Sequence, residues 1–162
     1  MKWFLVILGI LVCLVVIIII IGRLLPVKHT ASVQVLVNAS PAEIWARLVD
    51  VKDYPAWRKD VKSVDVRSPL EWVEVNNRGD SLPLKIVAQE PERHLVTQIQ
   101  GHDLPFGGGW EFTLKGNGGS TTVTITENGE VYNPFFRFVS KFIMGHSTNL
   151  RKYAGFLQES YL

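Results

Sequence analysis

The chain opens with a long, uninterrupted run of hydrophobic residues. Residues 3–21, WFLVILGILVCLVVIIIII, carry no charged side chain. As an α-helix rising 1.5 Å per residue, a run of about 19 residues would be roughly 28 Å long, close to the thickness of a bilayer's hydrocarbon core. We therefore expect residues 1–25 to be a transmembrane anchor that meets the membrane through residues 3–21, followed by a linker over residues 26–30.

The competing interpretation of this run is a cleaved signal peptide. The apolar stretch of a signal peptide usually covers about 7–15 residues and ends at a small-residue cleavage site. Here the run is longer, and the sequence GRLLPVKH that follows it has no A-x-A pattern. A retained single-pass anchor is favoured. Its orientation stays open, because Lys2 and the amino terminus lie on one side and Arg23 and Lys28 on the other. The two flanks carry nearly equal positive charge, so the positive-inside rule does not decide between them.

From residue 31 the pattern becomes that of a globular domain. Apolar and polar residues alternate in ASVQVLV, which predicts a strand. In the following NASPAEIWARLVD, Ser40 can cap a helix, Pro41 suits its first turn, and apolar residues then recur at helical spacing. Pro55 ends this helix and leaves room for only a short second one.

Between residues 61 and 127, apolar side chains recur at every second position. Polar, Gly-containing sequences such as NNRGDS and GNGGS separate the alternating segments and predict hairpin turns. The segments give six strand candidates: VKSVDVRS, LEWVEVNN, LPLKIVAQ, HLVTQIQ, GWEFTLKG and STTVTIT. With the strand at 31–37 they predict a seven-stranded antiparallel sheet.

The last predicted element is one long amphipathic helix that starts at Asn133 and Pro134. At 100° per residue its apolar side chains fall on an arc of roughly 160°, and His146 projects near the centre of that arc over a helix of about 25 residues. The arc consists of Phe135, Phe138, Val139, Phe142, Ile143, Leu150, Tyr153, Phe156 and Leu157. We expect this face to be core, because a membrane-lying helix would more often carry Lys and Arg on both flanks.

The order strand, two short helices, six strands and long helix predicts an α+β domain over residues 31–162. A strongly twisted sheet of seven strands curls. Wrapped around one helix, it can leave a cavity between sheet and helix. The residues that we expect to line this cavity are His146, Asn149, Phe138, Phe142, Trp110, Phe112, Phe106 and Trp57.

Two of these residues have other interpretations that stay open. Phe106 ends the apolar loop tip LPF, which could gate the cavity, dip into the bilayer interface, or simply plug the core. Trp57 is also explained as an ordinary packing residue of the short helix.

Glu71 with Glu74 is not a convincing catalytic carboxylate pair, since charged residues on alternating strands are mostly solvated.

The net charge and the positions of the cysteine and histidines argue against several classes of function. A formal net charge of +2 provides no strong basic field, which argues against a nucleic-acid partner. The only cysteine, Cys13, lies in the apolar run, so cysteine nucleophile chemistry is excluded. The histidines, at positions 29, 94, 102 and 146, lack the H-x₃-H spacing of a zinc site. We expect neither a metal nor a cofactor.

His146 is the best single candidate for chemistry. In an apolar cavity a neutral imidazole could orient a ligand hydroxyl or carbonyl, or act as an acid/base with a shifted pKa. The alternative is a core histidine bonded to a backbone carbonyl or a strand hydroxyl.

Three segments resemble the SRPBCC superfamily of START-related, birch-pollen-allergen-like and polyketide cyclase/dehydrase proteins. VNASPAEIWARLVDVKDYPAWRKDVKSVDV resembles its first strand, helix pair and second strand. GGWEFTLKGNGGSTTVTITENGEV resembles its paired late strands, and NPFFRFVSKFIMGHSTNLRKYAGFLQES its long C-terminal helix. The resemblance implies a helix-grip fold, a curved sheet wrapped around the last helix. It also implies a cavity that commonly binds apolar molecules such as lipids, sterols or polyketides.

Three functions are compatible with these features. The first is a membrane-anchored binding module for a hydrophobic small molecule or lipid. The second is a polyketide cyclase/dehydrase-like enzyme that uses His146 as acid/base. The third is a non-catalytic protein-interaction domain whose core is filled by its own side chains. A cavity too small for any ligand would rule out the first.

Overall fold

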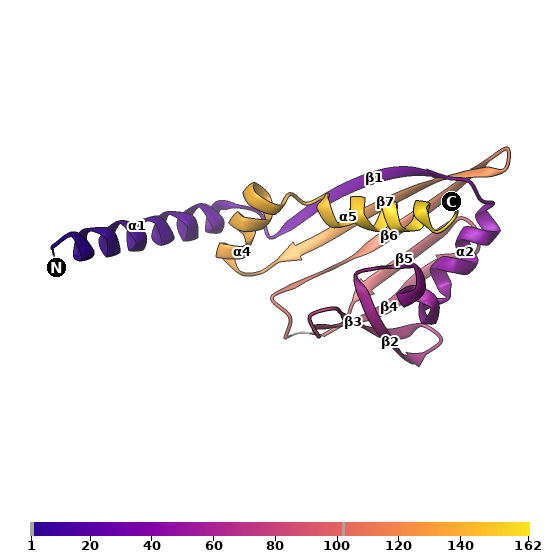
Figure 1. The fold of residues 1–162 in the computed structure, drawn as a ribbon, viewed down its shortest axis with the longest axis horizontal. Coiled ribbons are helices and arrows are strands. Elements are labelled where there is room, and N and C mark those ends of the chain that lie inside the picture. The colour runs from indigo at the N-terminus through magenta and orange to yellow at the C-terminus, as the bar shows by residue number, and fades with distance from the viewer. Residues whose placement is uncertain (1, 102) are drawn as a thin grey trace.

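One antiparallel sheet of seven strands organises the structure, a computed structural model that describes residues 2–101 and 103–162 (Figure 1). His102, one of the histidines considered above, lies outside the described residues. The strand order β1-β7-β6-β5-β4-β3-β2 makes β2 to β7 an up-and-down meander, with β1 added beside its last strand. The strands are β1 (Lys28–Val37), β2 (Val61–Ser68), β3 (Glu71–Asn76), β4 (Ser81–Glu90), β5 (His94–Ile99), β6 (Phe106–Asn117) and β7 (Ser120–Val131). The predicted seven-stranded antiparallel sheet is confirmed.

Helical segments precede β1, connect β1 to β2, and follow β7. Ser40 caps α2: its hydroxyl accepts from the Glu43 amide, and the Glu43 side chain accepts from the Ser40 amide. The helices after β1 are therefore where the sequence predicted them. The helical segments are α1 (Lys2–Leu24), α2 (Pro41–Val49), η1 (Val51–Asp53), α3 (Tyr54–Trp57), α4 (Pro134–Val139), the π-helical turn η2 (Ser140–Met144) and α5 (Thr148–Glu159).

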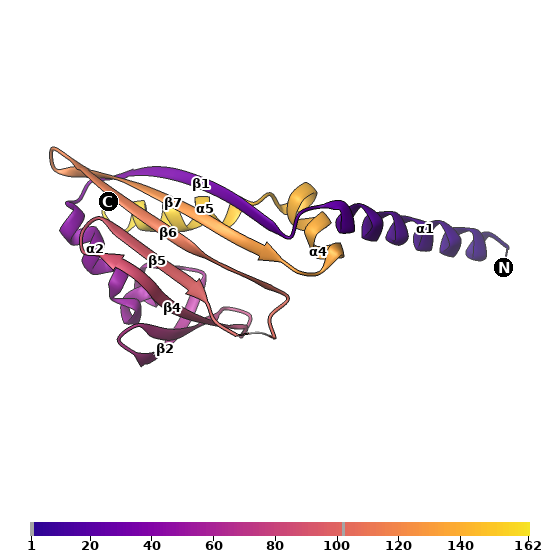
Figure 2. The same cartoon turned by 180° about the vertical axis from the view of Figure 1, so that it is seen from behind.

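The core lies between the sheet and the helices α2, α3 and α5. Helix α5 crosses one face of the sheet along β1 and β7 (Figures 1 and 2). Gln158 ties it there by donating to the Leu36 carbonyl at 3.0 Å. The largest fully buried apolar side chains come from the sheet, α2 and α5: Ile44, Leu48, Leu95, Ile125, Leu150, Leu157, Val37 and Val123.

Helix α1 projects away from the domain along the long axis of the molecule (Figure 1). It has 23 residues, its most apolar part has a mean hydropathy of 3.8, and 0% of that part is buried. Strand β1 begins at Lys28, before the domain start expected at residue 31. Only residues 25–27 therefore separate the apolar helix from the sheet.

The prediction of one continuous C-terminal helix is wrong. Gly145 interrupts the helix between η2 and α5 with φ +74°, a left-handed conformation that glycine adopts without a Cβ penalty. The projection at 100° per residue assumes an unbroken helix. Because the helix is interrupted at Gly145, side chains before and after this residue do not share one face. Only the second half, α5, covers the sheet, through the buried Leu150, Ala154 and Leu157. Phe142 and Ile143 of η2, predicted as core, are exposed.

The first half of the predicted helix packs against α1 instead of the sheet. Gly22 is the one buried residue of α1, and a Cβ at this position would collide with the backbone carbonyl of Pro134. Arg137 of α4 donates to the backbone carbonyls of Gly22 at 3.2 Å and Leu25 at 3.0 Å. These are the carbonyls that a helix end leaves without an intrahelical partner. Arg137 therefore caps the C-terminal end of α1.

Candidate functional site

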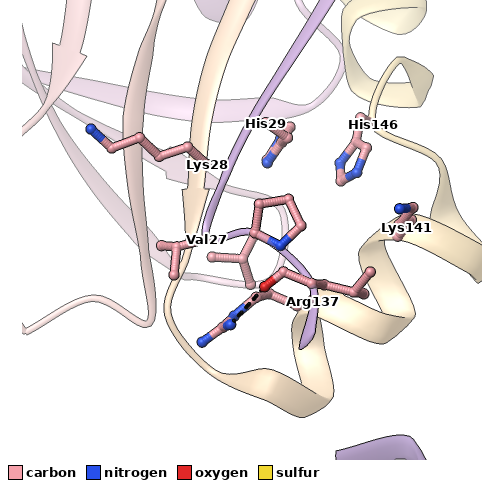
Figure 3. A pocket seen from close by; sticks show the side chains of 9 residues that line it. Val27, Lys28, His29, Arg137, Lys141 and His146 are labelled. Atoms are coloured by element: carbon pink, nitrogen blue, oxygen red, sulfur yellow. Dashed lines mark hydrogen bonds between the residues drawn. The ribbon is translucent and has the colours of Figure 1, made fainter. Parts of the chain in front are cut away.

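A pocket of about 250 Å³ lies where α1, β1 and α4 meet (Figure 3). It lies at the end of the domain next to the apolar helix, and not between the sheet and α5, where the sequence analysis placed a cavity. Ligand pockets usually measure about 300–1,000 Å³, so this pocket suits one part of a ligand. Its lining residues are Leu25, Pro26, Val27, Lys28, His29, Val131, Arg137, Lys141 and His146.

Two imidazoles form one wall of this pocket. The rings of His29, on β1, and His146, between η2 and α5, stack with centroids 3.9 Å apart and an interplanar angle of 23° (Figure 3). Gly129, opposite His29 on β7, makes room for the stack, because a Cβ there would collide with the His29 ring. The stack brings together residues from both ends of the domain sequence.

Hydrogen bonds hold each imidazole from behind. His29 Nε2 lies 3.2 Å from Glu127 Oε1, and Trp110 Nε1 donates to the other Glu127 oxygen at 3.3 Å. Ser140 Oγ and His146 Nδ1 share a hydrogen bond of 3.1 Å. Both rings are thus oriented, and His146 keeps its Nε2 for another partner.

The electrostatic surroundings of His146 favour its neutral form. Its pKa lies below the ordinary value, chiefly because partial burial disfavours the charged ring, and then because of His29 and Lys141, while Glu127 acts in the opposite direction. Near neutral pH the ring is uncharged and can donate one hydrogen bond and accept another. It can therefore bind a hydroxyl or carbonyl, or exchange a proton with one.

The remaining lining residues combine apolar and cationic groups. Leu25, Pro26, Val27 and Val131 provide the apolar surface. Arg137 is occupied: besides its two bonds to the end of α1, it donates to the Tyr132 carbonyl at 2.9 Å. Lys141 is exposed and close to His146 (Figure 3). The pocket therefore combines an apolar surface with two imidazoles and the side chains of Lys28 and Lys141.

A second cluster of polar side chains is buried inside the core. Arg58 donates to Glu74 at 2.9 Å, and Trp72 Nε1 donates to the same carboxylate oxygen at 3.2 Å. Glu74 is only 6% exposed, so the expectation that this carboxylate is solvated is wrong. Burial acts to lower the pKa of Arg58, but the carboxylates of Glu74 and Asp60 help to outweigh it, so the pKa lies above its usual value.

Two polar atoms in the same region have no hydrogen-bond partner among the described residues. They are the indole Nε1 of Trp57 and the hydroxyl of Tyr153. The guanidinium of Arg58 lies over the Tyr153 ring at 4.8 Å from its centroid. Burial raises the pKa of the Tyr153 hydroxyl, which therefore stays protonated.

Residues 28–153 match the family described as polyketide cyclase / dehydrase and lipid transport. The chain belongs to this family. Its fold is similar to a START superfamily protein from Mycobacterium smegmatis, with 20% sequence identity, a TM-score of 0.68, and 82% of this chain and 97% of that chain covered. It is also similar to truncated norcoclaurine synthase from Thalictrum flavum, with 14% identity, a TM-score of 0.67, and 84% and 94% covered. No curated protein sequence matches the chain.

One of the residues predicted to line the cavity of this polyketide cyclase/dehydrase family member lines the pocket, and a second is connected to it by hydrogen bonds. His146 contributes to its wall, and Trp110 is linked to it through Glu127 and His29. His29 and Glu127 were not among the residues predicted to line a cavity. Their contact depends on the pairing of β1 with β7, and only the alternation of both strands hinted that the two side chains share a face.

The other predicted residues are distributed over the rest of the domain. Trp57 and Phe112 are buried, and both pack against the Tyr153 ring, with centroids 5.5 Å and 5.4 Å away. Phe138 and Phe142 pack against each other at 4.9 Å on α4 and η2, away from the sheet. Asn149 and Phe106 are exposed, the latter at the start of β6.

Proposed function

We propose that this family member is a membrane-anchored binding module for a hydrophobic small molecule or lipid. The position of the pocket carries the proposal: residues 25–29, which directly follow the apolar helix α1, form much of its wall. A molecule leaving the bilayer beside α1 would meet this pocket first. The family description, which includes lipid transport, agrees with such a ligand.

The properties of α1 support a retained anchor. A helix of 23 residues is roughly 34 Å long at 1.5 Å per residue, enough to cross a hydrocarbon core. A signal sequence has similar composition, but it is removed and needs no built-in contact with the mature domain. Here Gly22 and Leu25 are held by Pro134 and Arg137. Such contacts favour a helix that stays attached.

The surroundings of the pocket support an elongated apolar ligand with one polar end. On the inner face of β1, Ala31 and Val33 next to the pocket are half-buried, whereas Val37 at the far end is fully buried. Apolar surface thus continues from the pocket along β1. The polar end of a ligand would meet His146 Nε2 and Lys141, and its apolar body would follow the strand.

The test is to identify what the full-length chain carries. The protein is purified in mild detergent, extracted with organic solvent, and the extract analysed by mass spectrometry. We expect a stoichiometric apolar species in the wild type and in Asn149→Ala, an exposed control, and its loss in Val131→Trp, which fills the pocket. A clean wild-type extract, also after incubation with membrane lipids, would contradict the proposal and favour a protein-interaction domain with a filled core.

Acid/base catalysis of the cyclase/dehydrase kind is a second candidate. The observation that favours it is the neutral His146, oriented by Ser140 and stacked on a His29 that Glu127 holds. The species found by extraction is incubated with the protein and its mass followed. Under the enzyme hypothesis His146→Ala abolishes a mass change, whereas under the binding hypothesis there is no mass change and the variant only weakens binding.

A further inference from the structure

Apolar side chains are concentrated on the segment from Pro134 to Met144, which we call the aromatic arm and which comprises α4 and η2. Its most exposed apolar residues are Phe136 at 50%, Phe142 at 57%, Ile143 at 71% and Met144 at 58%. Single exposed apolar residues are normal on protein surfaces, but contiguous groups mark interaction sites. The fold itself provides no cover for this group, since the arm has turned away from the sheet.

The arm lies beside the last turns of α1 in both views of the molecule (Figures 1 and 2). Along α1, Ile18, Ile19 and Ile21 are half-buried and Gly22 is buried, whereas the preceding residues are exposed. Ile18 is six residues before the helix end at Leu24, which corresponds to about 9 Å along the helix axis. The arm therefore overlaps the final part of the apolar run rather than lying beyond it.

The arm is fixed at this level by specific contacts. The Asn133 side chain caps α4 by accepting from the amides of Phe135 at 2.9 Å and Phe136 at 3.4 Å. Arg137 holds the arm to the carbonyls at the end of α1, and the Gly22–Pro134 approach brings the two backbones together. If α1 crosses a bilayer, these contacts place the arm at the depth where α1 leaves the hydrocarbon core.

Exposed cationic side chains lie in the same region, where α1 joins the domain. They are Arg23 in the last turn of α1, Lys28 at the start of β1, and Lys141 in the arm itself. Lys141 Nζ is 5.7 Å from the centroid of the Phe142 ring. Glu130 offsets Lys28 at 3.5 Å, whereas within residues 2–101 and 103–162 Arg23 and Lys141 form no ion pair. Apolar side chains flanked by Lys and Arg are typical of segments that lie in a membrane interface with anionic lipids.

We propose that the aromatic arm inserts Phe136, Phe142, Ile143 and Met144 into the interface of the leaflet where α1 emerges, with anionic lipid headgroups around Arg23 and Lys141. This inference rests on the membrane anchoring proposed above. A second protein chain is a poorer occupant, because specific interfaces use about 20–30 residues a side and the arm offers only a few. Insertion would place Arg137 and Lys141, which line the pocket, at headgroup level.

The test uses full-length protein in vesicles of phosphatidylcholine with phosphatidylglycerol. A polarity-sensitive dye on the native Cys13, in the middle of α1, reports whether α1 spans the bilayer. Ile143→Cys, made in a Cys13→Ala chain, reports the position of the arm. Asn117→Cys in the same background is the control, because it is an exposed residue in the hairpin between β6 and β7. Lipids spin-labelled near the headgroup or near the bilayer centre quench the dye according to depth.

We expect Cys13 to be quenched by the deep label and Ile143→Cys by the shallow label, several-fold more than Asn117→Cys. The shallow quenching should decrease in vesicles of phosphatidylcholine alone. An unquenched Ile143→Cys beside a quenched Cys13 would overturn the arm's insertion and leave the anchor intact. An unquenched Cys13 would remove the anchor and the insertion together. The dye on Ile143→Cys could instead report an apolar environment without quenching by lipid, and only at a high protein-to-lipid ratio. That result would overturn insertion in favour of a second copy of the chain.

Discussion

Arg137 donates a hydrogen bond to the backbone carbonyl of Gly22 at 3.2 Å, although 115 positions separate the two residues. This contact joins the first element of the chain to a helix near its end. The C-terminal helical region of this polyketide cyclase/dehydrase family member is divided into two parts at Gly145. The part after Gly145 covers the sheet, and the part before it holds the apolar helix and closes one side of the pocket.

Replacing Arg137 by Met should loosen the contact between α1 and α4. The substitution removes donors to three backbone carbonyls, those of Gly22, Leu25 and Tyr132. The bond to Tyr132 is exposed, so water can replace it, whereas the bonds to Gly22 and Leu25 are part-buried and their loss weakens the contact between the helices. We expect faster hydrogen exchange of the α4 amides by mass spectrometry of the full chain. Arg151→Met, an exposed position on α5, should leave exchange unchanged. Equal exchange in the two variants would show that Arg137 does not hold the arm.

A methyl group at Gly22 should separate the two helices by steric clash. A Cβ there meets backbone atoms of Pro134, which cannot rotate aside. Gly9→Ala is the matched control in the same helix, since a Cβ at Gly9 meets nothing within 4 Å, and it should be neutral or stabilise α1 by up to about 1 kcal/mol. We expect Gly22→Ala, but not Gly9→Ala, to make the arm sensitive to limited proteolysis. Resistance in both variants would contradict this arrangement.

Arg58 and Glu74 form a buried ion pair, and replacing either residue alone should destabilise the fold. Arg58→Met leaves a buried carboxylate without its partner, which costs about 3–5 kcal/mol, whereas Arg58→Met with Glu74→Leu should recover much of that loss. The exposed pair Lys85–Glu71, at a similar 2.9 Å, is the control, and Lys85→Met should cost less than about 1 kcal/mol. Denaturant unfolding measures all of these variants. A small effect of Arg58→Met would mean that water reaches Glu74.

Acid should destabilise the fold partly through His146. Its pKa in the folded chain lies below the ordinary 6.5, so the unfolded chain takes up this proton at a higher pH than the folded one. The stability that depends on neutral His146 is full above the ordinary value and is lost as pH falls through it toward the folded-state pKa. Unfolding between about pH 8 and about pH 5 should show a steeper loss for the wild type than for His146→Gln. Parallel curves would contradict a depressed pKa.

Local patterns account for the elements that were predicted correctly. Alternation in VEV or TVTIT identifies a strand because side chains of a strand point to alternate faces. Ser40 and Asn133 mark helix starts because each side chain caps its own backbone within three residues. Each of these relationships depends on neighbours in the sequence. For the C-terminal helix the start was predicted correctly but the break at Gly145 was not, since the spacing of apolar residues does not reveal where a helix is interrupted.

The sequence by itself determined the apolar helix, the seven strands, the helix pair after β1 and the resemblance that the family match confirms, because each is encoded by short-range spacing of apolar and polar residues. Only the tertiary structure decided where the pocket lies. His29 meets Glu127, Arg58 meets Glu74, and Arg137 meets Gly22 because of strand register and helix packing. Those contacts join residues that are distant in the chain, and their free energy depends on the burial that only the folded domain provides.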